Sequence, residues 1–230
     1  AVAECRNQSP EDGMDIDLDR MILVLQQAGL FVDVMRFGLD SLIDSDDDET
    51  AVTIIRIRDR FRENFGDKLE DFVEFYHYTT YHYNSSVAEN IIFGTSSNKS
   101  YNPRLVHENS KFNTFLQKAK IKEPLLHLGI ELASQAVDIL SGLDTVDLFF
   151  KNSPVPADKL EKCESILREL ESIQPLSLSK KNKKFLLSLA LNFTPSIHTM
   201  TVLPTQLKEN ILKARKSFPA WCESVSPGLF

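Results

Sequence analysis

Apolar residues recur at helical spacing in one segment after another of this chain, and this pattern constrains the fold more than any other feature. Neighbours in each stripe stand three or four positions apart, which is the period of one face of an α-helix. The stripes occupy residues 18–28, 112–119, 128–139, 160–170 and 207–218. We therefore predict a mainly α fold, a helical bundle with few or no strands.

Start and stop residues bound these helices. Aspartate favours the positive N-terminal end of a helix, proline suits its first turn, and glycine often ends it. The predicted boundaries are Asp15, Asp17, Asp19 and Gly29 for the first helix, Asn109 or Ser110 for the second, Pro124 and Gly142 for the third, and Pro204 with Thr205 for the last.

Residues 53–61 fit either of two structures. An alternation of isoleucine with arginine suits a half-buried strand, whereas Ile54, Ile57 and Phe61 fit one face of a helix. The segment aligns with residues 211–218, where the helical period is clear. We therefore predict a helix here as well.

Two alignments in the same order indicate an internal repeat. Residues 24–39 align with 115–130 at an offset of 91 (115 − 24), and residues 54–61 align with 211–218 at an offset of 157 (211 − 54). The second copy thus holds 66 extra residues (157 − 91). We predict two diverged, related halves, about 15–107 and an enlarged 108–230, within a single helical region 1–230.

Charge and cysteine content exclude several classes of function. The chain has 26 Lys and Arg against 33 Asp and Glu, a net charge of −7, which repels a nucleic-acid backbone. Cys5, Cys163 and Cys222 are odd in number and far apart, so they predict a reducing compartment rather than a disulfide framework or a zinc site. The first twenty residues are acidic, unlike a signal peptide.

The stretch 185–203 carries no formal charge and approaches the length of about 20 residues that a membrane-spanning helix needs. Asn192, Pro195 and His198 lie within it, where a bilayer penalises polar groups and helix breaks. We predict instead a buried helix that ends near Pro195, and a chain that does not span a membrane.

Residues 83–95 form the most informative motif of the chain. Ser86 and Glu89 stand in the S-x-x-E spacing of a capping box, which satisfies two backbone N–H groups at a helix start. Gly94 is the predicted left-handed residue that stops this short helix.

The string Tyr83-Asn-Ser-Ser-Val-Ala-Glu-Asn-Ile-Ile-Phe-Gly94 resembles the segment after the Q-loop in ATP-binding-cassette (ABC) nucleotide-binding domains. Leu25-x-x-Ala28-Gly29-Leu30 and Gly38-Leu39-Asp40-Ser41 are similar to the helical subdomain of that family. From about residue 18 to 220, the chain is similar to a helical insert of bacterial ABC transporter ATP-binding proteins in which this region is duplicated. Residues 75–84 lack the Asp-Pro usual in that insert.

The resemblance implies an accessory helical region that contacts the transmembrane partner or another protein, in the cytoplasm at the inner face of the cell membrane. ATP and Mg would bind elsewhere in such a parent, because this sequence contains no phosphate-binding loop, no L-S-G-G-Q string and no apolar run ending in Asp-Glu. The alternative is an independent helical-repeat adaptor that offers a groove to a partner helix. An enzyme of another type is the third possibility, and we predict no catalytic, cofactor-binding or metal-ligating residue.

Three clusters could carry chemistry, and each has a plainer interpretation. Residues 94–100 contain a Lys-Ser pair without the preceding glycine of a phosphate-binding loop. Residues 44–49 lack the glycine and glutamate of an EF-hand loop and suit a solvated acidic linker. His77 and His82 could ligate a metal, but packing of residues 75–83 as a short extended segment is the preferred interpretation.

The remaining charged residues are predicted to be solvated. Arg56, Arg58, Arg60 and Arg62 do not form one patch on a helix, because residues two apart point in different directions. Lys180, Lys181, Lys183 and Lys184 suit a solvated helix end, or a contact with acidic headgroups or an acidic protein surface. His127 and His198 lie beside apolar residues and are expected to be partly buried.

Overall fold

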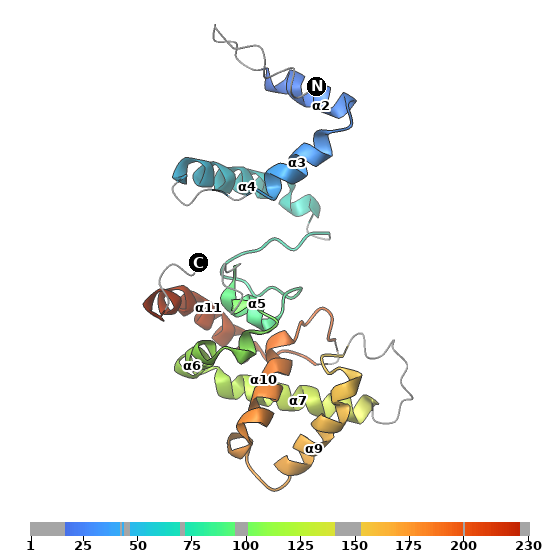
Figure 1. Ribbon diagram of the computed structural model, residues 1–230, viewed down its shortest axis with the longest axis vertical. Coiled ribbons are helices and arrows are strands. Elements are labelled where there is room, and N and C mark those ends of the chain that lie inside the picture. The colour runs from blue at the N-terminus through green and yellow to red at the C-terminus, as the bar shows by residue number, and fades with distance from the viewer. Residues whose placement is uncertain are drawn as a thin grey trace. The chain divides into compact units, whose positions relative to one another are not determined.

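The computed structural model describes residues 17–41, 43, 47–69, 72–94, 101–140, 153–199 and 201–225 (Figure 1). The α-helices are α2 (Leu18–Gln27), α3 (Phe31–Leu39), α4 (Asp48–Leu69), α5 (Val87–Ile92), α6 (Ser110–Lys118), α7 (Lys122–Leu140), α9 (Leu160–Leu170), α10 (Lys180–Asn192) and α11 (Thr205–Val225). Short 3-10 turns are η2 (Val106–Glu108), η3 (Ala157–Lys159) and η4 (Pro175–Ser177). These ranges contain no strand, so the predicted mainly α fold is confirmed, as is the helix predicted over 53–61.

The chain divides into two units, Ala1–Asp67 and Lys68–Phe230. The first contains α2, α3 and α4 as far as Asp67, and the second contains the other helices. The predicted halves divide the chain by its sequence repeat instead of by contact, and that two-halves organisation stays a prediction.

Local caps set the helix ends in the first unit. The Asp17 carboxylate accepts a hydrogen bond from the Arg20 N–H at 3.2 Å, and Gly29 ends the helix region with a φ of +72°, as predicted. Asp47 starts α4 by accepting from the Thr50 N–H at 3.0 Å. Hydrogen bonds from Thr50 lower the pKa of the Asp47 carboxyl.

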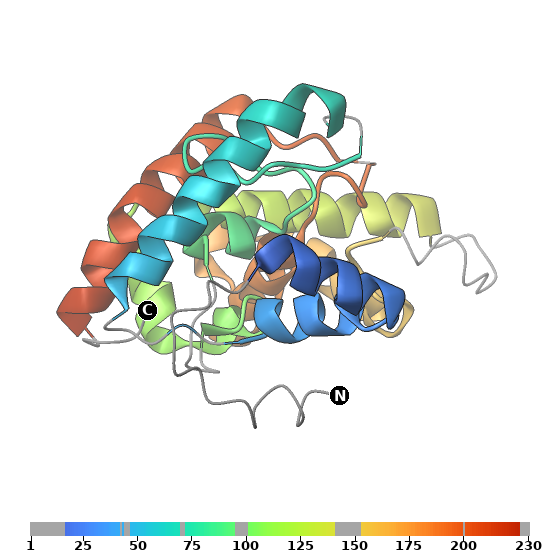
Figure 2. The ribbon, with the colours of Figure 1, turned by 90° about the horizontal axis from the view of Figure 1, so that it is seen from above.

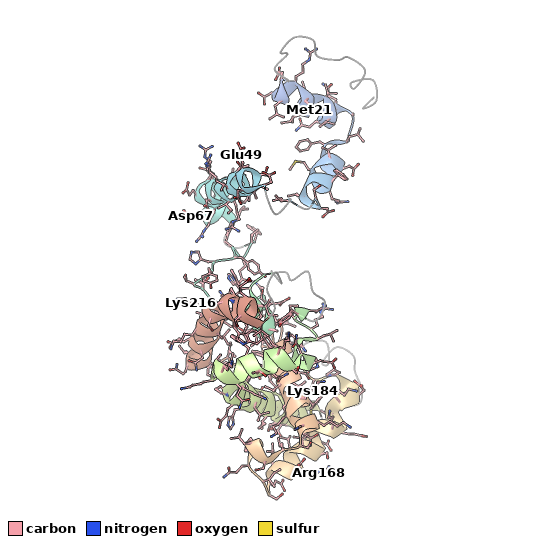
Figure 3. The ribbon with its side chains drawn as sticks, turned by 60° about the vertical axis from the view of Figure 1, so that its left-hand side comes forward. Met21, Glu49, Asp67, Arg168, Lys184 and Lys216 are labelled. Carbon is pink, nitrogen blue, oxygen red and sulfur yellow. The ribbon has the colours of Figure 1, made fainter. Side chains whose placement is uncertain are left out.

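No side chain of α2, α3 or α4 is buried. Their large apolar residues face solvent: Phe37 is 78% exposed, Leu39 80% and Met21 44%. Figure 3 draws these side chains, with Met21 labelled on α2 and Glu49 and Asp67 on α4. The described helices of the first unit therefore have apolar faces but no buried side chains among them.

The second unit has a dense core, in which α7 and α10 cross at Gly129. A Cβ at Gly129 would lie 2.2 Å from the carbonyl oxygen of Leu186, a backbone atom that cannot swing aside. The buried residues of α10 run from Leu186 to Leu191, and the helix ends at Asn192, which confirms a buried helix ending near Pro195. Figure 2 shows α7 and α11 as the long helices of this unit.

An aromatic cluster joins α6 to α11. The ring of Phe218 lies 5.7 Å from that of Phe112 and 5.0 Å from that of Phe115, and Trp221 stacks beside them. Asn109 caps α6, which resolves the predicted choice between Asn109 and Ser110. Buried aromatic rings dominate core energetics, so this cluster fixes α11 in the second unit. The predicted end of the third helix at Gly142 lies outside the described residues.

The short helix α5 has the predicted start and a different stop. The Ser86 side chain accepts from the Glu89 N–H at 3.2 Å, and the Glu89 carboxylate accepts from the Ser86 N–H at 2.7 Å, so the capping box is confirmed. The prediction for Gly94 was wrong, because Phe93 is the left-handed residue, with a φ of 46°. Contacts of the Phe93 ring with distant residues hold this backbone conformation, which local preference disfavours.

Candidate binding surfaces

A buried arginine holds residues 74–94 against α11. Arg215 is 1% exposed, and its Nε donates to the Asn90 carbonyl oxygen at 2.7 Å. Its terminal nitrogens donate to the carbonyl oxygens of Tyr78 and Thr80 at 2.9 and 2.7 Å, and to Asn90 Oδ1 at 2.7 Å. The guanidinium carbon also lies 4.3 Å from the centre of the Phe93 ring. One side chain thus satisfies several backbone groups that would otherwise be buried unpaired.

The charge of Arg215 is balanced by dipoles. Among the described residues, no carboxylate forms an ion pair with it. Burial lowers the pKa of the guanidinium, and the nearby tyrosines Tyr78 and Tyr81 oppose that change. Charge-assisted hydrogen bonds to carbonyl oxygens are roughly twice as strong as neutral ones, which compensates for the loss of hydration.

Asn90 shapes the loop that leads into α5. It is 1% exposed, and its Oδ1 accepts from the His82 N–H at 2.9 Å. Its Nδ2 lies 2.8, 3.2 and 3.0 Å from the carbonyl oxygens of His82, Ser85 and Ser86. A side chain with both a donor and an acceptor at this position closes the loop.

A stack of rings covers the other side of the same loop. The His82 ring lies 4.4 Å from the Tyr76 ring and 5.5 Å from the Phe93 ring, and the Tyr78 ring meets Phe93 edge-on at 5.5 Å. The Glu74 carboxylate lies 3.5 Å from His82 Nδ1. These contacts explain why Phe93 takes the left-handed conformation: its ring is held by His82, Tyr78 and Arg215.

Residues 193–208 complete the attachment of this segment. The Val87 N–H donates to the Phe193 carbonyl oxygen at 3.0 Å, which satisfies one of the free N–H groups at the start of α5. Lys208 Nζ donates to the Tyr83 hydroxyl at 2.8 Å. The motif that the sequence singled out is therefore an internal packing element of the second unit.

The apolar face of α4 is exposed instead. Ile54, Phe61 and Phe65 share one face at intervals of seven and four residues, and they are 46%, 47% and 45% exposed. The rings of Phe61 and Phe65 lie 5.1 Å apart. Arg58 is also exposed and lies on this face, four residues after Ile54. We call Ile54, Arg58, Phe61 and Phe65 the α4 face.

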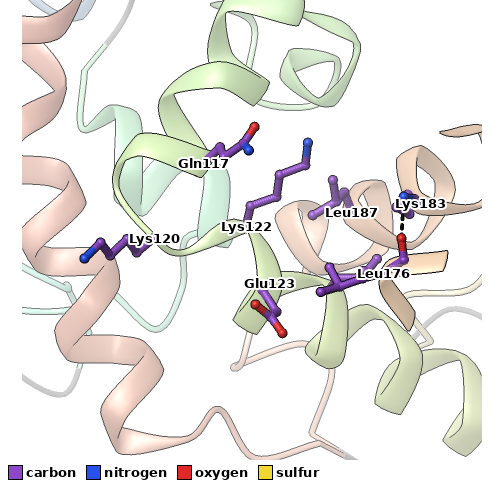
Figure 4. A pocket seen from close by; sticks show the side chains of 8 residues that line it. Gln117, Lys120, Lys122, Glu123, Leu176, Lys183 and Leu187 are labelled. Carbon is purple, nitrogen blue, oxygen red and sulfur yellow. Dashed lines mark hydrogen bonds between the residues drawn. The ribbon is translucent and has the colours of Figure 1, made fainter. Parts of the chain in front are cut away.

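A shallow pocket of about 550 Å³ lies between the start of α7 and the start of α10 (Figure 4). Lys120, Lys122 and Lys183 line it together with Glu123 and with leucines that include Leu176 and Leu187. Lys183 Nζ donates to the Leu176 carbonyl oxygen at 2.9 Å. The lining combines lysines and leucines, and among these residues no nucleophile is in contact with a base. The pocket therefore does not indicate a particular reaction.

Two of the histidines singled out in the sequence, His82 and His198, form hydrogen bonds with the backbone. Nε2 of His82 lies 3.0 Å from the His77 backbone N and 2.9 Å from the His77 carbonyl oxygen, so the His82 ring engages the loop backbone. His198 is partly buried as expected, and its Nδ1 accepts from the Thr194 N–H at 2.8 Å. The expectation for His127 was wrong, because it is exposed on the polar face of α7 that also carries Glu123 and Glu131.

The other predicted clusters are only partly described. Asp47, Asp48 and Glu49 of the acidic stretch lie at the start of α4, and residues 44–46 lie outside the described residues. Residues 95–100 of the Lys-Ser segment also lie outside them. At the start of α10, Lys184 Nζ lies 3.6 Å from a Glu108 carboxylate oxygen.

Two cysteines are described, and both are unsuited to nucleophilic chemistry at neutral pH. Cys163 and Cys222 are free and buried. Burial raises the pKa of each thiol to about 11, so the reactive thiolate is scarce. In the part of the chain that the structure describes, no three His, Cys, Asp or Glu side chains are grouped as metal ligands.

The helices were also compared with the requirements of a membrane span. No single helix within the described ranges is long and apolar enough to cross a bilayer. Helices α2 and α3 reach the length and apolar composition of a membrane-spanning helix only when they are counted together. The chain bends by 116° between them.

Comparisons with known proteins return no relative. No family model, no curated protein and no solved structure matches this chain. The interpretation of its function therefore depends on its own residues and geometry.

Proposed function

We propose that this chain is a non-enzymatic helical region that binds another protein through its first unit. The observation that carries the proposal is that no side chain of α2 or α3 is buried although both helices have an apolar face. Helices α2 and α3 have ten and nine residues. Isolated helices shorter than about 12–15 residues are marginal in water and depend on packing, so a partner that covers these faces supplies the missing burial.

The motif resemblance favours a particular form of this function. In that form the chain is an accessory helical region of an ABC transporter ATP-binding protein, at the inner face of the cell membrane, and contacts the transmembrane partner or another protein. ATP and Mg would be bound elsewhere in the parent. Ser86 and Glu89 cap α5, and Asn90 holds the loop that precedes it. These packing roles require these residue types, which supports the resemblance of the motif to that family.

The second form is an independent helical-repeat adaptor, and one experiment separates the two. The coding sequence on both sides of this chain either contains a phosphate-binding loop in the same reading frame, which favours the ABC form, or does not. A fluorescent ATP analogue gives an independent check, because both forms require that this chain alone neither binds it at micromolar concentration nor hydrolyses ATP.

Site-directed photo-crosslinking tests the binding function itself. A photoreactive phenylalanine analogue replaces Phe37 of α3, which is 78% exposed, or the neighbouring Arg36 as the control, in cells that make the protein. We expect a discrete crosslinked product from position 37 that mass spectrometry identifies as one protein, and little from position 36. Equal labelling of many proteins from both positions contradicts the proposal.

A further inference from the structure

The pocket between the start of α7 and the start of α10 is a site that the proposed function leaves unassigned. All eight residues that line it belong to the second unit, so no part of it comes from the first. Its volume of about 550 Å³ falls within the range of roughly 300–1,000 Å³ that pockets for small ligands occupy. A stable protein–protein interface instead takes about 20–30 residues from each partner. The size of the site therefore favours a small molecule.

One side of the pocket is apolar. Leu126 on α7 and Leu187 on α10 line it and are 3% and 2% exposed, whereas Leu176 on η4 is 56% exposed. The backbone of Leu176 is held against α10, because Lys183 Nζ donates to the Leu176 carbonyl oxygen at 2.9 Å. An exposed leucine is thus fixed in the same pocket as two buried ones, and a ligand that covers it removes apolar surface from water.

The other side of the pocket is positively charged. Lys120, Lys122 and Lys183 line it against one carboxylate, that of Glu123. Within the part of the chain that the structure describes, the ammonium group of Lys122 has neither a hydrogen-bond acceptor nor an ion-pair partner. Lys122 is half-buried, and Figure 4 shows its side chain extending to the same side as that of Gln117, whereas Glu123 extends to the opposite side. Because salt screens a half-buried charge less than one in open water, this ammonium group attracts an anion.

We propose that this pocket binds a small amphipathic carboxylate, which is an aliphatic chain that ends in one carboxylate group. The carboxylate pairs with the Lys122 ammonium group and accepts a hydrogen bond from the Gln117 side-chain amide. The aliphatic chain covers Leu176 and lies toward Leu187. Lys183 is a positioning residue, since it holds Leu176 in place. The inference concerns a site in the second unit and goes beyond the proposed protein-binding function of the first.

The combination of groups favours this ligand over simpler ones. Phosphate would pair with the lysines but leave the leucines uncovered. A neutral apolar ligand would cover the leucines but leave the half-buried ammonium group of Lys122 without a counter-charge, which costs free energy. A carboxylate on an aliphatic chain satisfies both sides of the pocket.

The test is a calorimetric titration of the full chain with decanoate, kept below the concentration at which it forms micelles. We expect saturable binding of one decanoate per chain at micromolar concentration. Lys122→Gln should weaken this binding about tenfold, because the carboxylate loses its counter-charge. Leu176→Ala should weaken it about threefold, because the aliphatic chain loses apolar contact area.

Two controls separate the site from general attraction. Lys118→Gln removes the same charge at an exposed position of α6 that does not line the pocket, and its affinity should stay within about twofold of the unchanged chain. Decanol, which has the same aliphatic chain without the charge, should bind about tenfold more weakly than decanoate and should be insensitive to Lys122→Gln. Circular dichroism should show equal helix content in all three variants, because none of the substituted residues is buried.

Absence of decanoate binding overturns the inference. An equal effect of Lys122→Gln and Lys118→Gln overturns it too, because it shows that Lys122 forms no specific site, and equal affinity for decanol and decanoate does so by showing apolar adsorption. A photoreactive group at position 176 that captures a protein, with no decanoate binding, assigns the pocket to a protein partner instead. Crosslinking from position 37 tests the proposed function separately, so either proposal can fail alone.

Discussion

Helices α4 and α11 carry the same spacing of isoleucine, arginine and phenylalanine in opposite surroundings. On α11 the three side chains are buried, and the arginine donates to residues 74–94. On α4 the three are exposed. The same spacing of residue types thus occurs on a buried and on an exposed helix face, so the pattern by itself does not decide whether these side chains are buried.

The comparison has an energetic side. Burying an apolar side chain is worth about 1.5–3 kcal/mol, so the filled face of α11 stabilises the second unit substantially. The exposed side chains of α4 bury less apolar surface and so contribute less. Substitutions at corresponding positions should therefore have very different effects, and the following predictions run from the largest effect to the smallest.

The substitution Arg215→Met should lower the free energy of unfolding by about 3–5 kcal/mol, because several buried carbonyl oxygens lose their donor at about 1–3 kcal/mol each. The corresponding change Arg58→Met should alter stability by less than about 0.5 kcal/mol, as is usual for surface positions. Urea unfolding followed by the fluorescence of Trp221, the single tryptophan, measures the change in the second unit, and circular dichroism measures the change in helix α4. A loss below 1 kcal/mol for Arg215→Met would show that water replaces the guanidinium.

A methyl group at Gly129 should separate α7 from α10. Because the added Cβ would lie 2.2 Å from the Leu186 carbonyl oxygen, we expect Gly129→Ala to destabilise the second unit by about 2–3 kcal/mol. Gly38→Ala is the counterpart in the first unit, where nothing lies within 4 Å, and it should increase helix content, since alanine stabilises a helix interior by about 0.5–1 kcal/mol over glycine. Thermal unfolding followed by circular dichroism compares them. Stabilisation by Gly129→Ala together with a loss of helix content in Gly38→Ala would contradict the account, because the first unit would then be the tightly packed one.

Removal of the α5 cap should have an intermediate effect. Ser86→Ala eliminates the acceptor for the Glu89 N–H, at a cost of about 1 kcal/mol. Ser217→Ala on the exposed side of α11 is the control and should be nearly neutral. Urea unfolding of the two variants side by side measures the difference, and an equal response would mean that the capping box does not stabilise the segment on α11.

The smallest effect is a pH dependence from His198. Burial lowers the pKa of this imidazole, and its Nδ1 accepts from the Thr194 N–H, so the folded state binds a proton less readily than the unfolded chain. Stability should therefore fall as the pH drops below the ordinary histidine value of about 6.5 and be fully present above it. His198→Asn, which keeps an acceptor without the titration, should flatten part of that slope between pH 7.5 and pH 5. An unchanged slope would assign the pH dependence to other groups.

The sequence was sufficient for features that depend on nearby residues. Stripes three and four residues apart located the helices, and the S-x-x-E spacing located the start of α5. Features set by distant residues were missed. Phe93, and not Gly94, is left-handed because Arg215, His82 and Tyr78 hold its ring.

Some missed features had a signal that could have been used. Arg215 stands within the apolar stripe of its helix, between Ile211 and Phe218, a position that points to burial of the arginine. The exposure of His127 follows from Glu123 and Glu131, which lie four residues to either side and mark the polar face of α7. By contrast, nothing in the local sequence of α4 could show that its apolar side chains are exposed, because the pattern is the same as that of α11.

Hydrogen exchange of the full chain, resolved along the sequence by mass spectrometry, tests the central claim most directly. Because α11 carries buried side chains and α4 carries none, the amides of α11 should exchange slowly and those of α4 rapidly. Equal, strong protection of α4 and α11 would contradict the account, because the side chains of α4 would then be as buried as those of α11.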